Sequence, residues 1–128
     1  MKQKRIMVID DEKIVGDMAK MALEQDGYIV EAFMSAEPAL ARLKEERFDV
    51  VITDYKMKGI DGIEVLRIVK RLYPETTVII VTAFANLDAA IEAFRSDVHD
   101  FFPKPVKLKE LKASIRHALS KIEQNNVT

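Results

Sequence analysis

Short runs of β-branched apolar residues alternate along this 128-residue chain with longer segments whose apolar residues recur at helical spacing. The clearest runs cover residues 6–9, 50–52 and 78–81, and each would be apolar on both faces of a strand. Strands of that kind belong to parallel sheets that are covered by helices on both sides. The alternation therefore predicts an α/β domain.

Weaker patterns complete the series. Residues 28–33 and the segment around residues 101–102 predict two further strands. Helical stripes lie between and after the strands, at Ile14/Met18/Met21/Ala22, Pro38/Ala39/Leu43, Val65/Ile68/Val69/Leu72, Leu87/Ala90/Ile91/Phe94 and Leu108/Leu111/Ile115/Leu119/Ile122. We interpret such stripes as core-facing, because a helical stripe is more often core than interface, and we keep Ile14, Val15 and Met18 as candidates for a docking surface. Five successive βα units predict a flavodoxin-like, five-stranded parallel sheet of order 2-1-3-4-5, with right-handed crossovers and five helices on its two faces.

Composition excludes several classes of protein. Lys and Arg number 20 against 21 Asp and Glu, so we expect no direct nucleic-acid binding by this domain. The lack of Cys excludes a disulfide scaffold, thiol catalysis and a Cys-based zinc site. No apolar run approaches the roughly 20 residues of a membrane span, and we expect no membrane partner. We expect one cytoplasmic domain over residues 1–123, with a short tail over residues 124–128.

Polar residues follow the predicted strands at the point where each strand ends. They are Asp10-Asp11-Glu12, Thr53-Asp54, Thr82-Ala83 and Lys104-Pro105. Adjacent parallel strands lie about 4.8 Å apart and end at the same edge of the sheet, so Asp10, Asp11 and Asp54 should converge. Taken singly, each residue has an ordinary explanation as a helix cap or a solvated side chain. Their joint placement predicts a site.

The residue types at this edge indicate phosphoryl chemistry. Carboxylates held close together repel one another unless a cation joins them. A cluster that offers only oxygen ligands suits a hard divalent ion, and we expect Mg²⁺. Lys104 adds a positive charge, and Thr82 adds a hydroxyl group. Such a set can stabilise and position a phosphoryl group, and one carboxylate can itself be the nucleophile.

Over about residues 4–122 the chain resembles the receiver domain of two-component response regulators. Four motifs in the family's order carry the resemblance: Val8-Ile9-Asp10-Asp11-Glu12, Thr53-Asp54-Tyr55-Lys56-Met57 with Gly62 following, Val81-Thr82-Ala83, and Asp100-Phe101-Phe102-Pro103-Lys104-Pro105. The resemblance implies a phosphorylation-driven signalling switch that catalyses its own modification and is not a turnover enzyme.

The resemblance also assigns roles to the acids and the lysine. Asp54 would accept a phosphoryl group from the phosphohistidine of a sensor histidine kinase or a histidine phosphotransfer protein. Asp11 and Asp54 would bind Mg²⁺ directly, Asp10 would assist through a water molecule, and the main-chain carbonyl of Lys56 would complete the protein ligands. Lys104 would pair first with Asp54 and then with the phosphoryl oxygens.

The switch itself would involve other residues. Thr82 and the Ala83 amide would bind the phosphoryl group, and Phe101 would follow Thr82 inward. This movement would alter the surface formed by the fourth helix, the last strand and the last helix. Lys56 and Phe84 would flank the path of the hydrolytic water, so we expect slow loss of the phosphoryl group. A downstream effector domain and a phosphorylation-dependent homodimer are the further partners that the resemblance allows.

The chain departs from the family pattern at a few positions. Lys58 stands where Pro is usual, and Asp97-Val98 replaces Gly-Ala, which puts the packing before the last strand in question. The resemblance also implies a cis bond between Lys104 and Pro105.

Three other functions are compatible with parts of the sequence. An Mg²⁺-dependent phosphohydrolase with an Asp nucleophile is the main alternative, although no second acid or substrate cap is evident. A flavin or nucleotide domain would need a phosphate-binding loop where Asp10-Asp11-Glu12 stands. An inactive receiver scaffold does not explain the complete set of acids.

Overall fold

Strands and helices alternate strictly in the computed structural model, which describes residues 3–126. The elements in chain order are β1 (Arg5–Ile9), α1 (Lys13–Gln25), β2 (Ile29–Phe33), α2 (Ala36–Glu45), β3 (Val50–Thr53), α3 (Gly62–Leu72), β4 (Thr77–Thr82), α4 (Leu87–Arg95), β5 (Asp100–Pro103) and α5 (Leu108–Asn126). The five predicted βα units are therefore confirmed.

The strands form one parallel sheet of order β2-β1-β3-β4-β5, as predicted. All residues of β3 and β4 are buried, which matches their apolar sequences. Two strand registers align the carboxyl ends of the central strands. Ile9 pairs with Thr53 across β1 and β3, and Thr82 pairs with Pro103 across β4 and β5. The residues that come after these strands consequently meet at one edge.

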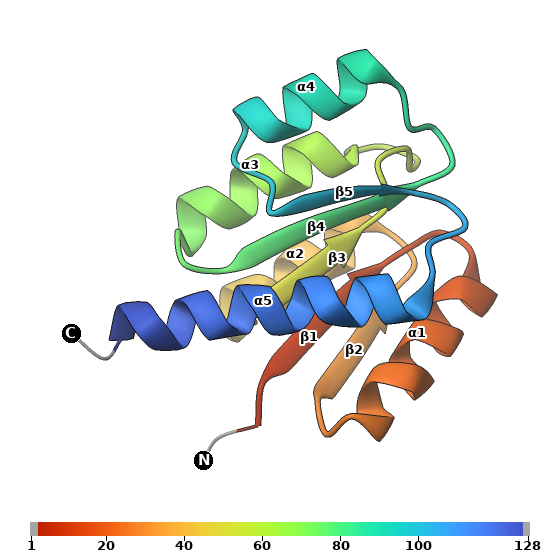
Figure 1. Ribbon diagram of the computed structural model, residues 1–128. Coiled ribbons are helices and arrows are strands. Elements are labelled where there is room, and N and C mark those ends of the chain that lie inside the picture. Colours follow the sequence, from red (N-terminus) through yellow and green to blue (C-terminus); the bar gives the residue numbers. More distant parts are fainter. Residues whose placement is uncertain (1–2, 127–128) are drawn as a thin grey trace.

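Helices cover both faces of the sheet (Figure 1), with α1 and α5 on one side and α2, α3 and α4 on the other. Alternate residues of the strands point to opposite faces of the sheet and belong to two separate hydrophobic cores. Ile6 and Ile52 pack with Leu23 of α1 and Ile115 of α5. Met7, Val51 and Ile80 belong to the core that includes the buried residues of α2, α3 and α4. This division follows from the two-residue period of a strand.

Two of the predicted core-facing helix stripes are wrong. In α1, Ile14 is 72% and Met18 is 67% exposed, whereas Leu23 is buried. In α4, Ala89 and Ala93 are buried. The large apolar side chains of the α4 stripe are exposed instead, namely Leu87, Ile91 and Phe94. Small residues on the inner face let α4 approach the sheet closely, so its large side chains point outward.

Several smaller expectations can also be compared with the structure. The Lys104-Pro105 bond is cis, as the resemblance implies. Asp97 has a φ of 73°, which is the left-handed conformation expected where the family has Gly, and Val98 is accommodated in the core. Helix α5 reaches Asn126, inside the predicted tail, and residues 127–128 lie outside the described part. Within residues 3–126, no helix combines the length and apolarity that crossing a membrane requires.

Candidate functional site

Backbone pairing brings two of the predicted acids together at the carboxyl ends of β1 and β3. The amide of Asp54 donates to the carbonyl of Ile9 at 3.0 Å, and the amide of Asp10 donates to the carbonyl of Phe33 at 3.0 Å. Asp10 is 5% exposed and Asp54 is 6% exposed. Two carboxylates are therefore held beside each other in a site that is almost closed to water.

Asp11 completes an acidic cluster that can hold a metal ion. Asp10, Asp11 and Asp54 each offer a carboxylate oxygen, and the three oxygens lie within 4.8 Å of one another. Asp11 is exposed and the other two are buried, so the cluster opens to solvent on the Asp11 side. Oδ1 of Asp54 is buried and has no hydrogen-bond partner. Buried carboxylate oxygens normally have partners, and this donor set fits a hard cation.

Lys104 supplies the counter-charge. Its Nζ lies 2.8 Å from Oδ2 of Asp10 and 2.9 Å from Oδ2 of Asp54. Its own amide donates to the carbonyl of Thr82 at 2.9 Å, which fixes the start of this side chain. Burial lowers the pKa of Lys104, but the hydrogen bonds to Asp10 and Asp54 outweigh burial and raise the pKa above its usual value. The ammonium therefore stays charged at any physiological pH.

Thr82 ends β4 and is fully buried. Its hydroxyl oxygen accepts a hydrogen bond from the amide of Phe84 at 3.1 Å. In this structure the hydroxyl is therefore engaged by the loop that leads to α4. Ala83 lies between these two residues and is exposed.

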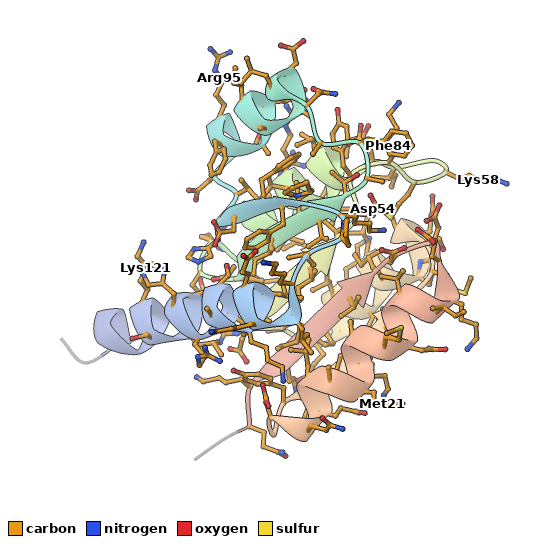
Figure 2. The ribbon with its side chains drawn as sticks, turned by 45° about the vertical axis from the view of Figure 1, so that its right-hand side comes forward. Met21, Asp54, Lys58, Phe84, Arg95 and Lys121 are labelled. Carbon is orange, nitrogen blue, oxygen red and sulfur yellow. The ribbon has the colours of Figure 1, made fainter. Side chains whose placement is uncertain are left out.

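Lys56 and Phe84 come from two different loops and meet beside the site. Nζ of Lys56 lies 5.5 Å from the centroid of the Phe84 ring, within the range of a cation–π contact. Phe84 is 55% exposed. Figure 2 shows Asp54, Phe84 and Lys58 on the same side of the domain, with Lys58 extending outward from its loop. The departure from the family pattern at Lys58 thus leaves the acids untouched.

Gly62 makes the loop after Asp54 compact. Its amide donates to the carbonyl of Tyr55 at 2.7 Å, and a Cβ at this position would clash with the carbonyl oxygen of Asp54 and come within 2.9 Å of Cα of Tyr55. The side chain of Asp61 caps α3 by accepting from the amide of Glu64 at 2.9 Å. Close backbone approach, which no side chain would permit, is the physical reason for a Gly here.

Phe101 lies in β5, opposite Ile80 of β4. Its side chain is partly buried and packs against the core shared with α2, α3 and α4. It is thus on the sheet face that α4 covers, where a rearrangement of α4 would change its surroundings.

Two contacts at the site were not foreseen from the sequence. Oε1 of Glu12 lies 3.5 Å from Nζ of Lys104, so a fourth acid belongs to the cluster's rim. The hydroxyl of Thr53 donates to the carbonyl of Asp54 at 2.9 Å and supports the backbone there. The acidic run at residues 10–12 was a usable signal for Glu12, but nothing in the sequence pointed to the Thr53 contact.

Comparison with known proteins gives a consistent result. Residues 6–116 match the family described as "Response regulator receiver domain". The chain is 34% identical over 120 residues to the DNA-binding transcriptional regulator NtrC of Proteus hauseri. The aligned region covers 94% of this chain and 25% of that protein. It is 33% identical over 115 residues to the transcriptional regulatory protein ZraR of Salmonella typhimurium, and the aligned region covers 90% of this chain and 26% of that protein. The chain thus spans about a quarter of these relatives.

Solved structures agree. A CheY-like response regulator receiver domain protein from Methanospirillum hungatei superposes with a TM-score of 0.93 at 30% identity, covering 97% of this chain and 99% of that one. The beryllofluoride-activated NtrC4 receiver domain dimer gives a TM-score of 0.88 at 28% identity, and the match covers 93% of this chain and 98% of that one.

Proposed function

The chain belongs to the receiver domains of response regulators, and we propose that Asp54 is the residue whose phosphorylation operates it as a switch. One observation carries this assignment. Oδ1 of Asp54 is buried without a partner, while Oδ2 of the same carboxylate is held by Lys104. A carboxylate that is fixed through one oxygen and free at the other is suited to attack an electrophile.

The transfer requires one bond to form and one to break. Oδ1 of Asp54 attacks the phosphorus of a phosphohistidine, the new O–P bond forms, and the P–N bond breaks with its electron pair on the imidazole nitrogen. Charge accumulates on the phosphoryl oxygens as this happens. The Lys104 ammonium, already placed 2.9 Å from Asp54, can turn to these oxygens and stabilise that charge.

We infer that the ion held by the acidic cluster is Mg²⁺. Asp11 and Asp54 would be its direct side-chain ligands, Asp10 would assist through a water molecule, and the main-chain carbonyl of Lys56 would add a further oxygen. When bound, the ion supplies positive charge that lets three acids and a phosphoryl group share one site. Asp10 is joined to Lys104 at 2.8 Å, and the lysine balances the excess negative charge of the cluster.

The switch starts with Thr82. On phosphorylation its hydroxyl would leave the amide of Phe84, from which it accepts a hydrogen bond at 3.1 Å, and donate to the phosphoryl group together with the amide of Ala83. The freed loop would let α4 move, and Phe101 would turn into the space behind it. The readout is a changed surface over α4, β5 and α5.

Lys56 and Phe84 set how long the phosphoryl group lasts. Their cation–π contact, with Nζ 5.5 Å from the ring centroid, joins the loops after β3 and β4 beside Asp54. A water that attacks the phosphoryl group in line with the Asp54 oxygen would have to pass these two side chains. We therefore expect the phosphorylated form to persist for minutes or longer.

The partners follow from the family and from the surface. A sensor histidine kinase or a phosphotransfer protein would deliver the phosphoryl group, and the exposed α1 residues Ile14 and Met18 suit its docking surface. Because the chain spans a quarter of relatives that include a DNA-binding transcriptional regulator, we propose an effector domain as the downstream partner. We propose the cytoplasm as the place where this receiver domain acts. A dimeric, activated relative supports a phosphorylation-dependent homodimer.

We propose stoichiometric phosphorylation and no turnover on external substrates. Stoichiometric phosphorylation can be distinguished from turnover by treating the protein with acetyl phosphate and measuring its intact mass. Wild type in Mg²⁺ should gain one phosphoryl group, whereas Asp54→Ala, or wild type in EDTA, should gain none. Asp61→Ala is the matched control, because this acid caps α3 and lies outside the cluster, and it should still be modified. Sustained release of phosphate from a small ester at catalytic rates would instead support the phosphohydrolase.

A further inference from the structure

The chain has two histidines, and the fold places them side by side. His99 comes directly before β5, at the amino end of that strand, and His117 lies on α5. Their ring centroids are 5.4 Å apart, and the ring planes meet at 33°. Figure 2 shows Lys121, one turn of α5 beyond His117, on the side of the domain away from Asp54. The histidine pair is therefore separate from the phosphorylation site.

His99 has a ring nitrogen that no described residue engages. Its side chain is 15% exposed, and Nε2 is buried without a hydrogen-bond partner within residues 3–126. Buried polar atoms normally have a partner, so this nitrogen requires an explanation. Oδ2 of Asp100 lies 3.8 Å from Nε2, which is too far for a hydrogen bond. The two atoms can bind one metal ion instead, because such an ion lies about 2.0–2.2 Å from each of its ligands.

Helix α5 holds the Asp100 carboxylate in place. The hydroxyl of Ser114 donates a hydrogen bond to Oδ2 of Asp100. Ser114 is 6% exposed, although its buried neighbours on α5, Leu111 and Ile115, are apolar. Ser114 and His117 are three residues apart and lie on the same side of the helix. Carboxylates that bind metals are commonly oriented by a second hydrogen bond of this kind, so α5 supplies both a ligand and the support for another.

Two imidazoles and one carboxylate form a donor set that suits Zn²⁺, whereas Mg²⁺ takes oxygen ligands. Two histidine rings that share a tetrahedral zinc ion have their centres about 5.2 Å apart, and the observed separation is 5.4 Å. The three side chains do not converge as tightly as the acids around Asp54. His117 is exposed, so a turn of its ring can close the site. The nearby charge of Lys121 opposes a cation here, and we therefore expect reversible binding.

We propose that His99, Asp100 and His117 bind a Zn²⁺ ion that joins the start of β5 to α5. Ser114 is a positioning residue, because it acts through the Asp100 carboxylate that its hydroxyl holds. Water would take the fourth position on the ion. Metal binding would stabilise the packing of α5 against β5. The proposal does not depend on the function of Asp54, since the two sites have no residue in common.

Calorimetric titration of the full chain with Zn²⁺ tests the ligand set. Excess Mg²⁺ is present throughout, so that the acidic cluster is occupied. Wild type should bind one Zn²⁺ per chain, and His99→Gln and His117→Gln should each lower the affinity by more than about tenfold. Ser114→Ala should lower it about tenfold, the scale for removing a group that orients a ligand. Arg116→Gln, at the exposed position before His117, is the matched control and should bind as wild type does.

Nitrogen-15 NMR of the imidazoles shows where the ion binds. Because the chain has two histidines, each ring can be followed separately, and Zn²⁺ should shift the ring nitrogens of both. Asp54→Asn should keep these shifts although it removes the proposed phosphoacceptor, so failure of one proposal is distinguishable from failure of the other. Equal affinity in wild type and both histidine variants, imidazole signals that Zn²⁺ leaves unshifted, or zinc binding that excess Mg²⁺ abolishes would each contradict the proposal.

Discussion

Nζ of Lys104 lies 2.9 Å from Oδ2 of Asp54, whereas Oδ1 of the same carboxylate is buried without a partner. The lysine thus holds the carboxylate in place through one oxygen and leaves the other free for chemistry. It also neutralises Asp10, whose Oδ2 lies 2.8 Å from the same ammonium. Stability and reactivity at this edge of the sheet therefore depend on one cation.

Lys104→Gln should destabilise the metal-free domain by about 3 kcal/mol, the scale for removing one partner from a buried ion pair. Asp10 and Asp54, 5% and 6% exposed, would lose their shared cation. Added Mg²⁺ should then restore more stability to the variant than to wild type, because the ion replaces the lost charge. Urea unfolding with and without Mg²⁺ measures both effects. Lys58→Gln, on the exposed loop, should behave as wild type, and an equal Mg²⁺ response in all three proteins would contradict this view.

Gly62→Ala should destabilise the domain by about 1–3 kcal/mol, because the added methyl group meets backbone and cannot be accommodated by a side-chain movement. The Cβ would lie 2.9 Å from Cα of Tyr55 and would also clash with the Asp54 carbonyl. The loop would shift, so beryllofluoride affinity should fall as well. Gly16→Ala is the matched control, since its Cβ would make an ordinary 3.7 Å contact with Ala32 from within α1. That change should stabilise the domain by about 0.5–1 kcal/mol.

Lys56→Asn should shorten the lifetime of the phosphorylated form. The shorter side chain removes the cation–π contact with Phe84 and opens the approach of water to the phosphoryl group. Phe84→Ala should act in the same direction, and the double variant should show less than the product of the two single effects because the residues act as one barrier. Loss of phosphorylated mass with time measures the rates, with Lys58→Asn as control. Unchanged lifetimes in both single variants would remove these residues from any role in hydrolysis.

His99 should make the domain less stable as the pH falls from about 7 toward 5.5. Burial lowers the pKa of His99 from its usual 6.5. Nε2 is buried without a hydrogen-bond partner, although Oδ2 of Asp100 lies 3.8 Å away. The unfolded chain therefore takes up a proton near pH 6.5, whereas the folded chain takes it up only at a lower pH. The contribution of His99 to the free energy of unfolding is thus fully present above pH 6.5 and declines as the pH falls below it. The charged and titratable groups that act on the His99 ring are Asp100, His117 and Lys121. In urea titrations, His99→Gln should show a shallower decline than wild type, and an identical decline would contradict the assignment.

The sheet and the acidic site were predictable from the sequence because both depend on short-range patterns. Apolar runs such as residues 78–81 can be buried on both faces only inside a parallel sheet, and β4 is buried throughout. Once the strands are placed, their carboxyl ends define one edge, and the pairing of Ile9 with Thr53 brings Asp10 beside Asp54. The cis bond before Pro105 followed from the family resemblance alone.

The outer faces of α1 and α4 were not predictable in the same way. Helical spacing shows that Leu87 and Phe94 share a face, but it does not show which face meets the sheet. Ala89 and Ala93 allow close packing of α4, and this advantage is invisible to a pattern that counts only large apolar residues. Likewise, the contact between Lys56 and Phe84 joins two loops whose relative position only the folded chain defines.

Mapping the modified residue tests the central claim most directly. The chain is phosphorylated with acetyl phosphate in Mg²⁺, treated with borohydride, which reduces an aspartyl phosphate to homoserine, and digested for peptide mass spectrometry. Reduction should yield homoserine at position 54, with Asp10 and Asp11 unchanged, and no homoserine when Mg²⁺ is chelated. Homoserine at either of the other two positions, or none at all in a protein that still binds the metal, would contradict the assignment of Asp54 as phosphoacceptor.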